Sequence, residues 1–215
     1  MRLSIIIPMG PGEAVPQELL TALRSSGEPV EKILACCEPP PRPLAPGLRQ
    51  TKTAPGRGCQ QNAGAAIARG KWLWFLHADS RLGGEVLDKV LQFIDGSEAL
   101  GYCRLRFAAD GPALTRLNAL GANLRSRWLG LPYGDQGLCL PATWFHRLGG
   151  FREDLDRGED LDLVVRAAGA GLSPRCMGPT VITSARRYQD QGWLRTTLAH
   201  QRAAWRLIQT ARQSA

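Results

Sequence analysis

The sequence lacks a long hydrophobic run. Its N-terminus, MRLSIIIP, has a handful of apolar residues before Pro8 and no small-residue cleavage site, so it does not resemble a secretory signal. No later stretch approaches the roughly 20 apolar residues that a membrane-spanning helix requires. These absences predict a cytosolic protein without a transmembrane helix.

The sequence also lacks paired cysteine motifs. None of the six cysteines forms a C-x-x-C pair, and none has ligand-like spacing with His77, His146 or His200. A disulfide framework and a structural zinc site are therefore not expected. We predict reduced, mostly buried thiols at positions 36, 37, 59, 103, 139 and 176.

Basic residues outnumber acidic ones. The chain has 27 Lys and Arg against 19 Asp and Glu, a formal net charge of +8, which favours anionic partners. The arginines are spread from Arg2 to Arg212, and no basic run is interleaved with aromatic residues. We therefore do not expect nucleic acid as a partner; phosphorylated small molecules and an acidic membrane surface stay open.

Short apolar segments alternate with helical patterns along the 215 residues, which predicts a single α/β domain. No repeat or polar linker divides the chain. The prolines between positions 39 and 46 predict an extended surface loop. Strands are predicted at 3–7, 30–36, 72–76, 101–107, 138–140 and 180–184, and helices at 17–25, 58–69, 87–94, 114–128, 143–148, 161–168 and 193–212.

Polar residues follow the predicted strand 72–76, within the segment WLWFLHADS. Ligands of open α/β sheets bind beyond the carboxyl ends of the strands, and a carboxylate there could hold Mg²⁺ or Mn²⁺ against a diphosphate. If the strand continues, His77 and Asp79 point to the same side. Alternatively, Asp79 caps a helix that begins near Gly84. Spacing alone does not choose between these two interpretations.

The string N-A-G-x-A-x-A-x-G, followed by an apolar strand and H-A-D-S, resembles family 2 glycosyltransferases of the GT-A fold. More narrowly, the chain resembles a bacterial branch with the strings F-L-H-A-D-T, G-D-Q, E-D and S-A-R-R. These strings correspond to Phe75–Ser80, Gly134–Gln136, Glu159–Asp160 and Ser184–Arg187. The resemblance implies a mixed, mostly parallel, Rossmann-like sheet flanked by helices.

The resemblance also implies a reaction, in which a sugar moves from a nucleoside-diphosphate sugar to an acceptor hydroxyl with inversion at the anomeric carbon. Asp79 would bind the divalent metal, and His77, in the place of the motif's usual first acid, would contact the donor or orient Asp79. An acid of the pair Glu159 and Asp160 would be the general base that an alcohol nucleophile needs, with Asp160 preferred. The alternative for this pair is capping, or a favourable interaction with the dipole, of the following helix.

Other residues of the motifs are implied to bind substrate. Gln136 would bind substrate, and its neighbour Asp135, which falls where the family places acceptor-side residues, is counted with the catalytic acids. Three arginines are candidates to neutralise the departing pyrophosphate, namely Arg57, Arg186 and Arg187. The alternative for these three arginines is a solvated surface charge. Asn62 would face the donor, and its alternative is an N-terminal helix residue without a ligand.

The nucleoside-binding motifs depart from the family pattern. Met9–Glu13 replaces the usual N-E after the first strand, and Cys36–Pro39 replaces an acidic D-G-S-x-D element, which leaves Glu38 as the acid for the base or ribose. Two alternative functions stay open for this reason: a nucleotidyltransferase, and a non-catalytic module that binds nucleotide-sugar.

The chain is expected to divide into a nucleotide-sugar-binding half at 1–110, an acceptor and catalytic half at 111–190, and a basic amphipathic helix at 191–215. That helix alternates tryptophan, leucine and arginine, the composition of a helix on an anionic membrane. Packing against the core is the alternative. A membrane contact at the inner face would make a lipid-linked acceptor plausible.

Overall fold

The computed structural model describes residues 1–24, 30–38, 47–96 and 98–186, together with residues 188, 193, 195 and 197. Four parallel strands form its first half: β1 (Leu3–Met9), β2 (Val30–Cys36), β3 (Leu48–Lys52) and β4 (Trp72–Phe75). Every residue of β1 is buried, as expected for a central parallel strand covered on both faces.

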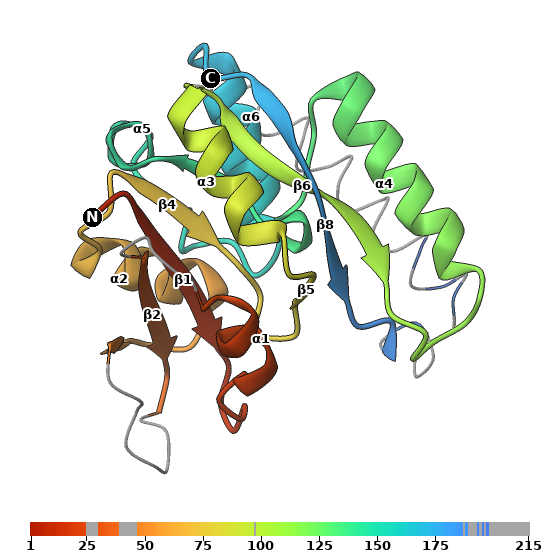
Figure 1. Cartoon of the computed structure of the whole chain (residues 1–215), viewed down its shortest axis with the longest axis horizontal. Coiled ribbons are helices and arrows are strands. Elements are labelled where there is room, and N and C mark those ends of the chain that lie inside the picture. Colours follow the sequence, from red (N-terminus) through yellow and green to blue (C-terminus); the bar gives the residue numbers. More distant parts are fainter. Residues whose placement is uncertain are drawn as a thin grey trace.

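The second half of the sheet contains β5 (Arg81–Leu82), β6 (Leu100–Phe107), β7 (Cys139–Pro141) and β8 (Pro174–Thr183). The strand order is β3-β2-β1-β4-β7-β6-β8-β5. Only β7 and β5 run against the others, because β7 is antiparallel to β4 and β6, and β5 is antiparallel to β8. The carboxyl ends of β1, β2, β3, β4, β6 and β8 therefore meet along one edge (Figure 1).

Helices cover both faces of this sheet. On one face, α1 (Gln17–Ala22) and α3 (Val86–Gly96) pack on β1 and β8 through one apolar cluster. On the other, α2 (Arg57–Ile67), α5 (Ala142–Arg147) and α6 (Glu159–Gly169) bury a second cluster. Gly64 lets α2 approach β1 closely, since a Cβ there would lie 2.5 Å from Ile6. The prediction of a mixed, mostly parallel sheet flanked by helices in one domain is confirmed.

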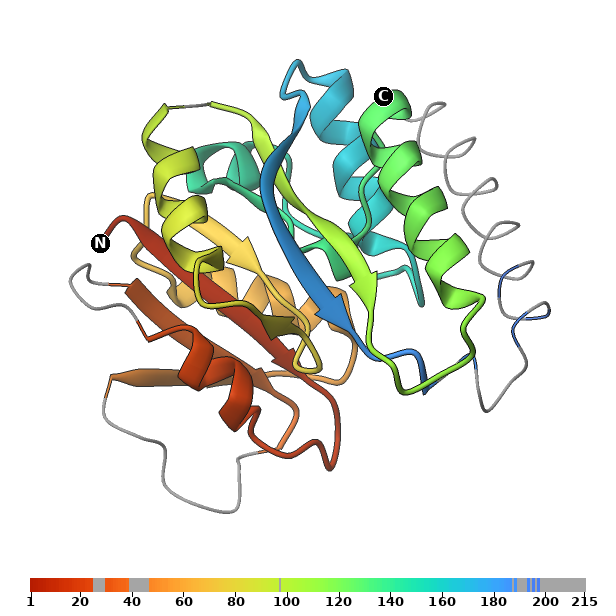
Figure 2. The same ribbon diagram turned by 45° about the vertical axis from the view of Figure 1, so that its right-hand side comes forward.

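Helix α4 (Thr115–Leu129) lies beside β6 (Figure 2). The Asn123 side chain completes the exposed strand edge, as its Oδ1 accepts from Leu105 N–H at 2.8 Å and its amide donates to Leu105 O at 2.9 Å. On the outer side the helix exposes Leu117, Leu120, Leu124 and Trp128. Within the described part of the chain, no helix is both long enough and apolar enough to cross a bilayer.

Only the first part of the predicted C-terminal helix can be placed. Trp193 donates to Asn118 Oδ1 of α4 at 2.6 Å, and Asn118 donates to Thr197 Oγ1 at 2.9 Å. The rest of that segment, like the proline-rich stretch at 39–46, lies outside the described residues. The predicted membrane contact of this helix therefore stays a prediction.

Several predicted boundaries were wrong. Helix α6 begins at Glu159, so Glu159 and Asp160 form its first turn instead of preceding it. Strand β4 ends at Phe75 and is followed by a turn, and β8 begins at Pro174, before the predicted 180. The strands β3 and β5 were not predicted. All six cysteines are free, although only Cys36, Cys103 and Cys139 are fully buried.

A buried carboxylate joins the first three strands. Glu31 on β2 accepts from Ser4 Oγ at 2.5 Å, from Arg69 N–H at 2.8 Å and from the Arg49 guanidinium on β3. Burial alone would raise the pKa of Glu31, but the hydrogen bonds from Ser4, Arg69 and Arg49 outweigh it, so the pKa is lowered. The ionised form is therefore the one that holds β3 at the sheet edge.

Glu31→Gln is expected to lower the free energy of unfolding at pH 7 by about 2–4 kcal/mol, because it weakens several charge-assisted bonds in a buried place. Since the folded pKa is depressed, this stabilisation is present above the unfolded pKa and is lost as the pH falls through the folded value. Urea unfolding at pH 7 and pH 3 measures both effects. Asp95→Asn, which breaks the exposed pair with Arg2, is the control and should change stability by less than about 1 kcal/mol.

Candidate active site

Polar residues from both halves of the chain gather at the carboxyl edge of the sheet. Asp79 follows β4, and Asp110 and Ser184 follow β6 and β8. The short 3₁₀ helix η1 (Gly134–Gln136) and the first turns of α2 and α6 reach the same edge. Four separate motifs of the sequence therefore contribute to one region of the surface.

Asp79 lies in a turn beyond β4, which Ser80 N–H closes by donating to His77 O at 3.1 Å. Its side chain is exposed, and its Oδ2 accepts a hydrogen bond from Thr183 Oγ1 at 3.3 Å at the end of β8. Because β4 ends at Phe75, the strand does not continue through His77 and Asp79, which was the condition for the two side chains to point to the same side. The capping alternative fails as well, because β5 intervenes before α3 begins at Val86.

Asp160 is fixed by main-chain N–H groups. Its Oδ2 accepts from Gly134 N–H of η1, and its Oδ1 accepts from Leu161 N–H at 2.8 Å. A Cβ on Gly134 would lie 2.9 Å from Asp160 Oδ2 and 3.2 Å from His77 Nε2, so Asp160 and His77 flank this glycine. The N-cap of α6 is Gly158, so Asp160 lies inside the first turn, where its bond from Leu161 N–H leaves part of the acceptor capacity of the carboxylate unused.

Asp135 is the acid whose protonation is most perturbed. Burial raises its pKa, and the charges of Asp160 and Asp79 add to this while Arg125 and Arg57 oppose it, which brings the value to about 6. Its buried Oδ1 accepts no hydrogen bond from any described residue. A carboxyl group with a free oxygen and a pKa near neutrality can exchange a proton at physiological pH.

Glu159 and Arg57 link α6 to α2. The two side chains approach to 3.6 Å, and Glu159 is buried whereas Arg57 is half exposed. Burial and the neighbouring Asp160 raise the pKa of Glu159, and Arg57 partly offsets them. A cation in the first turn of a helix is unfavourable on dipole grounds, so Arg57 depends on an anionic neighbour. A phosphate group could share the exposed part of its guanidinium.

Two predicted substrate ligands use their amides within the protein. Asn62 donates to Phe151 O at 2.9 Å and to Glu153 Oε1 at 2.8 Å, and accepts from Phe151 N–H at 2.9 Å. Gln136 is completely buried; its amide donates to Cys103 O at 3.1 Å, and its Oε1 accepts from Ser126 Oγ at 2.7 Å. These bonds favour positioning roles, for the loop after α5 and for η1, over direct ligand contact.

Asp110 holds the first two residues of the S-A-R-R motif, Ser184 and Ala185. Asp110 accepts from Ser184 Oγ at 2.8 Å and from Ala185 N–H at 2.7 Å. Arg186 is largely exposed, with its Nε donating to Ser184 Oγ at 3.0 Å and lying 4.0 Å from Asp110. Arg186 thus has guanidinium donors facing solvent, and Arg187 lies outside the described residues.

The predicted nucleoside end lies beyond β1 and β2. Glu38 is exposed after β2, where it could reach a ribose or base. Gln60 of α2 holds the two strand ends together by donating to Met9 O and to Ala35 O, the latter at 3.2 Å. After β1, the Glu13 carboxylate accepts from Gly10 N–H at 2.9 Å and closes the Gly10–Glu13 turn.

The described residues fit a metal ion only with help from a ligand. Across the described ranges, no cluster of three or more His, Cys, Asp or Glu side chains could hold a metal. Asp79 nevertheless offers an exposed carboxylate with hard oxygen donors, and Mg²⁺ is commonly held by one or two carboxylates together with substrate phosphates. The donor set thus suits a cation that arrives with a diphosphate.

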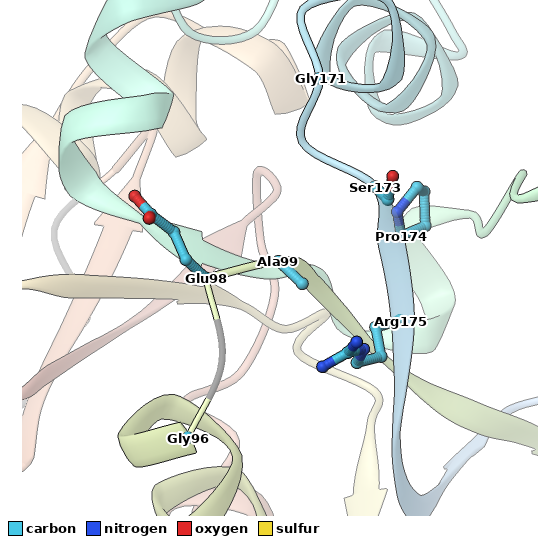
Figure 3. A pocket seen from close by; sticks show the side chains of 7 residues that line it. All are labelled: Gly96, Glu98, Ala99, Gly171, Ser173, Pro174 and Arg175. Carbon is cyan, nitrogen blue, oxygen red and sulfur yellow. The ribbon is translucent and has the colours of Figure 1, made fainter.

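A hollow of about 350 Å³ lies at the opposite end of the sheet, away from these acids. Glu98 and Ala99, just before β6, and Ser173, just before β8, line it (Figure 3). Its acid Glu98 accepts from Trp144 Nε1 at 3.1 Å. Because ligands of open α/β sheets bind at the carboxyl ends, this hollow is not the candidate active site.

Sequence reasoning missed three residues of the site region. Asp110 and Thr183 acquire their roles only when β6 and β8 pair, and neither belongs to a recognisable motif. Arg125 of α4 lies 3.5 Å from the Tyr133 ring centre and lowers the pKa of Asp135. The only signal for Arg125 is a charge in an amphipathic pattern, which also describes a surface arginine.

Comparisons with solved structures identify the fold. TarS 1–349 from S. aureus in complex with UDP superposes with a TM-score of 0.66 at 14% identity, over 86% of this chain and 61% of that one. Its complex with UDP-GlcNAc gives a TM-score of 0.64 at 15% identity, over 86% and 58%. The mannosyltransferase PcManGT from Pyrobaculum calidifontis, in complex with GDP-Man and Mn²⁺, gives 0.60 at 15% identity, over 83% and 56%.

The likeness is one of structure and not of sequence. No protein-family model matches the chain, and no curated protein sequence is detectably similar to it. The chain spans about three fifths of the length of TarS 1–349. The expected GT-A-like fold is thereby confirmed, since the structures that superpose on this chain are those of glycosyltransferases.

Asp135→Asn is expected to stabilise the protein at pH 7.5 by about 1–3 kcal/mol, because it removes a buried charge whose pKa is raised from 3.8 to about 6. A raised carboxyl pKa means that the folded state binds more protons than the unfolded state, so wild-type stability falls as the pH rises through this window. The gain should shrink to well below about 1 kcal/mol near pH 4, where the folded state is protonated and the unfolded state is partly protonated.

Thermal and urea unfolding between pH 4 and pH 8 test this prediction. Asp88→Asn, an exposed change on α3, is the matched control and should leave the pH profile unaltered. A pH-independent gain for Asp135→Asn would show that burial and neighbouring acids do not govern the protonation of Asp135.

Proposed function

We propose that this protein is an inverting glycosyltransferase that moves a sugar from a nucleoside-diphosphate sugar to an acceptor hydroxyl. The observation that carries the proposal is the convergence of Asp79, Asp135 and Asp160 at the carboxyl edge of a sheet with a glycosyltransferase fold. The relatives in that fold hold UDP, UDP-GlcNAc, or GDP-Man with Mn²⁺.

In this proposal the donor diphosphate lies between Asp79 and the arginines of the edge. Asp79 would hold Mg²⁺ or Mn²⁺, which when bound would neutralise the diphosphate as it leaves. Arg57 and Arg186 face the same region with exposed guanidinium groups and would bind phosphate oxygens. Glu38 would contact the nucleoside, and His77 would orient the donor beside Gly134.

Asp160 is the proposed general base. The Gly134 and Leu161 N–H groups orient its carboxylate, which keeps further lone pairs to accept the proton of the acceptor hydroxyl during attack. Asp135 is the second candidate, because its Oδ1 is free of partners among the described residues and its pKa of about 6 suits proton exchange. Glu159 would position Arg57 through their ion pair and partly neutralise the charge of its guanidinium.

The alternative functions account for fewer of the observations. A nucleotidyltransferase needs a basic, glycine-rich phosphate loop after the first strand, yet the Glu13 carboxylate occupies Gly10 N–H there and would repel a phosphate. A non-catalytic module would need neither an oriented Asp160 nor an Asp135 poised near neutrality. The cytosolic location stays a prediction, and it is compatible with both a glycosyltransferase and a nucleotidyltransferase.

Metal-dependent donor binding should require Asp79. Calorimetric titration of UDP-, GDP- and dTDP-sugars is expected to find one donor whose affinity rises at least about tenfold with Mn²⁺, a difference of about 1.4 kcal/mol. Asp79→Asn should abolish that gain, because it removes the anionic ligand while keeping an acceptor for Thr183. Asp88→Asn should retain the gain, and the absence of metal-dependent binding for every donor would refute the proposed function.

Asp160→Asn should reduce sugar transfer at least about a hundredfold and change the donor Kd by less than about threefold, as expected for loss of a general base. Both oxygens of Asp160 accept hydrogen bonds from main-chain N–H groups, and asparagine has only one acceptor oxygen. The variant therefore also loses one of these bonds, which should lower the free energy of unfolding by about 1–2 kcal/mol. Transfer rates against pH, with unfolding measured alongside, separate the two effects. If Asp135→Asn alone removes the acidic limb of the profile, Asp135 is the base instead.

A further inference from the structure

A second hollow, of about 690 Å³, adjoins the proposed active site. Two strands that line it lie close to Asp79 in the chain or in space: β5 begins two residues after Asp79, and Thr183 of β8 donates to Asp79. The end of β6 and the start of α4 line the rest of the hollow. The lining combines three arginines, Arg81, Arg106 and Arg116, with the apolar residues Pro112 and Ile182 and the strand end at Phe107.

Strand pairing places two of these arginines on one face. Ile182 is in register with Arg81 on β5 and with Arg106 on β6, and residues opposite each other in a sheet point to the same side. Arg81 and Arg106 therefore flank the Ile182 side chain, about 10 Å apart at the backbone, which is two strand spacings. Arg116 joins them from the first turn of α4.

Few acids oppose these charges. No Asp or Glu lines the hollow, and the carboxylate nearest to its arginines is that of Glu18, an exposed side chain 3.7 Å from Arg81. Arg106 and Arg116 are exposed, and no ion pair within the described residues involves them. Guanidinium groups gathered without acids attract a multivalent anion, and phosphate accepts their paired N–H donors.

We infer that this hollow binds the phosphate group of a phosphate ester whose organic part contacts Pro112 and Ile182. The assignment of that ester as the acceptor rests on the proposed function, because β5 and β8, which line the hollow, also border Asp79. The site is separate from the proposed diphosphate site, which uses Arg57 and Arg186. A soluble phosphomonoester and a phospholipid headgroup share this chemistry, and the exposed leucines of α4 make the second source worth testing.

The test compares two double variants with equal change of charge. Arg106→Gln with Arg116→Gln removes two arginines of the hollow. Arg104→Gln with Arg127→Gln removes exposed arginines of the same strand and the same helix that do not line it. Phenyl phosphate, inorganic phosphate and neutral benzyl alcohol are titrated by NMR without divalent metal.

Wild type and the control variant are expected to bind phenyl phosphate more tightly than phosphate or benzyl alcohol, because both charge and ring contribute. The variant lacking Arg106 and Arg116 should bind it at least about tenfold more weakly. Phosphatidylcholine vesicles with and without phosphatidic acid form a second arm. Binding that depends on Arg106 and Arg116 in the vesicle arm assigns a lipid headgroup, and binding only to phenyl phosphate assigns a soluble ester.

Equal affinities for the two double variants, or no saturable binding in either arm, would overturn the inference. Titration of UDP with Mn²⁺ is run in parallel and should be the same for both variants. If wild type fails to bind any nucleotide but the arginine-dependent phosphate binding persists, the hollow is an anion site and the proposed transferase activity is wrong. If nucleotide binds but phosphate binding does not depend on Arg106 and Arg116, the hollow is not an anion site and the proposed transferase activity is unaffected.

Discussion

The arrangement of the site depends on one contact, between the Asp160 carboxylate and the main-chain N–H of Gly134. It ties the first turn of α6 to η1, two segments that are far apart in the sequence. A Cβ at position 134 would lie 2.9 Å from Asp160 Oδ2 and 3.2 Å from His77 Nε2, so a glycine suits this close approach. Gln136 then anchors η1 to β6 and α4, and Glu159 connects α6 to Arg57. A single backbone contact thus sets the positions of residues from four elements.

That contact brings like charges together. Asp160 and Asp79 both raise the pKa of Asp135, and Asp160 also raises that of Glu159. The cations that oppose this, Arg57 and Arg125, only partly compensate. A diphosphate would add negative charge, so it could approach these acids only with a cation or through the arginines at the rim. The acids alone would attract a cation, but no cluster of three ligands among the described residues could hold one, so the proposed metal would come with the donor.

Most of the fold could be predicted from the sequence, because the central strands are buried on both faces. Continuous apolar runs identified β1, β2 and β4, whereas α2 ends at Ile67, two residues before the predicted end at 69. The missed strands carry no such pattern. β3, with the sequence LRQTK, is a polar edge strand held through Arg49 and Glu31, and the two residues of β5 become a strand only by pairing with β8. Both depend on partners that local sequence does not reveal.

The candidate site was predictable in its location but less so in the division of roles. Parallel strands bring their carboxyl ends to one edge, so polar residues after a strand, such as Asp79, were expected there. That the motifs at 134–136 and 159–160 meet follows only from the contact between η1 and α6. A motif does not distinguish a residue that meets a ligand from one that supports it. Hydrogen bonding does distinguish them. The amides of Asn62 and Gln136 already donate to main-chain oxygens of the protein, whereas Asp79 is exposed and Asp135 has an oxygen without a hydrogen-bond partner among the described residues. The polar groups left without a full set of internal partners are therefore the ones from which the chemistry should be argued.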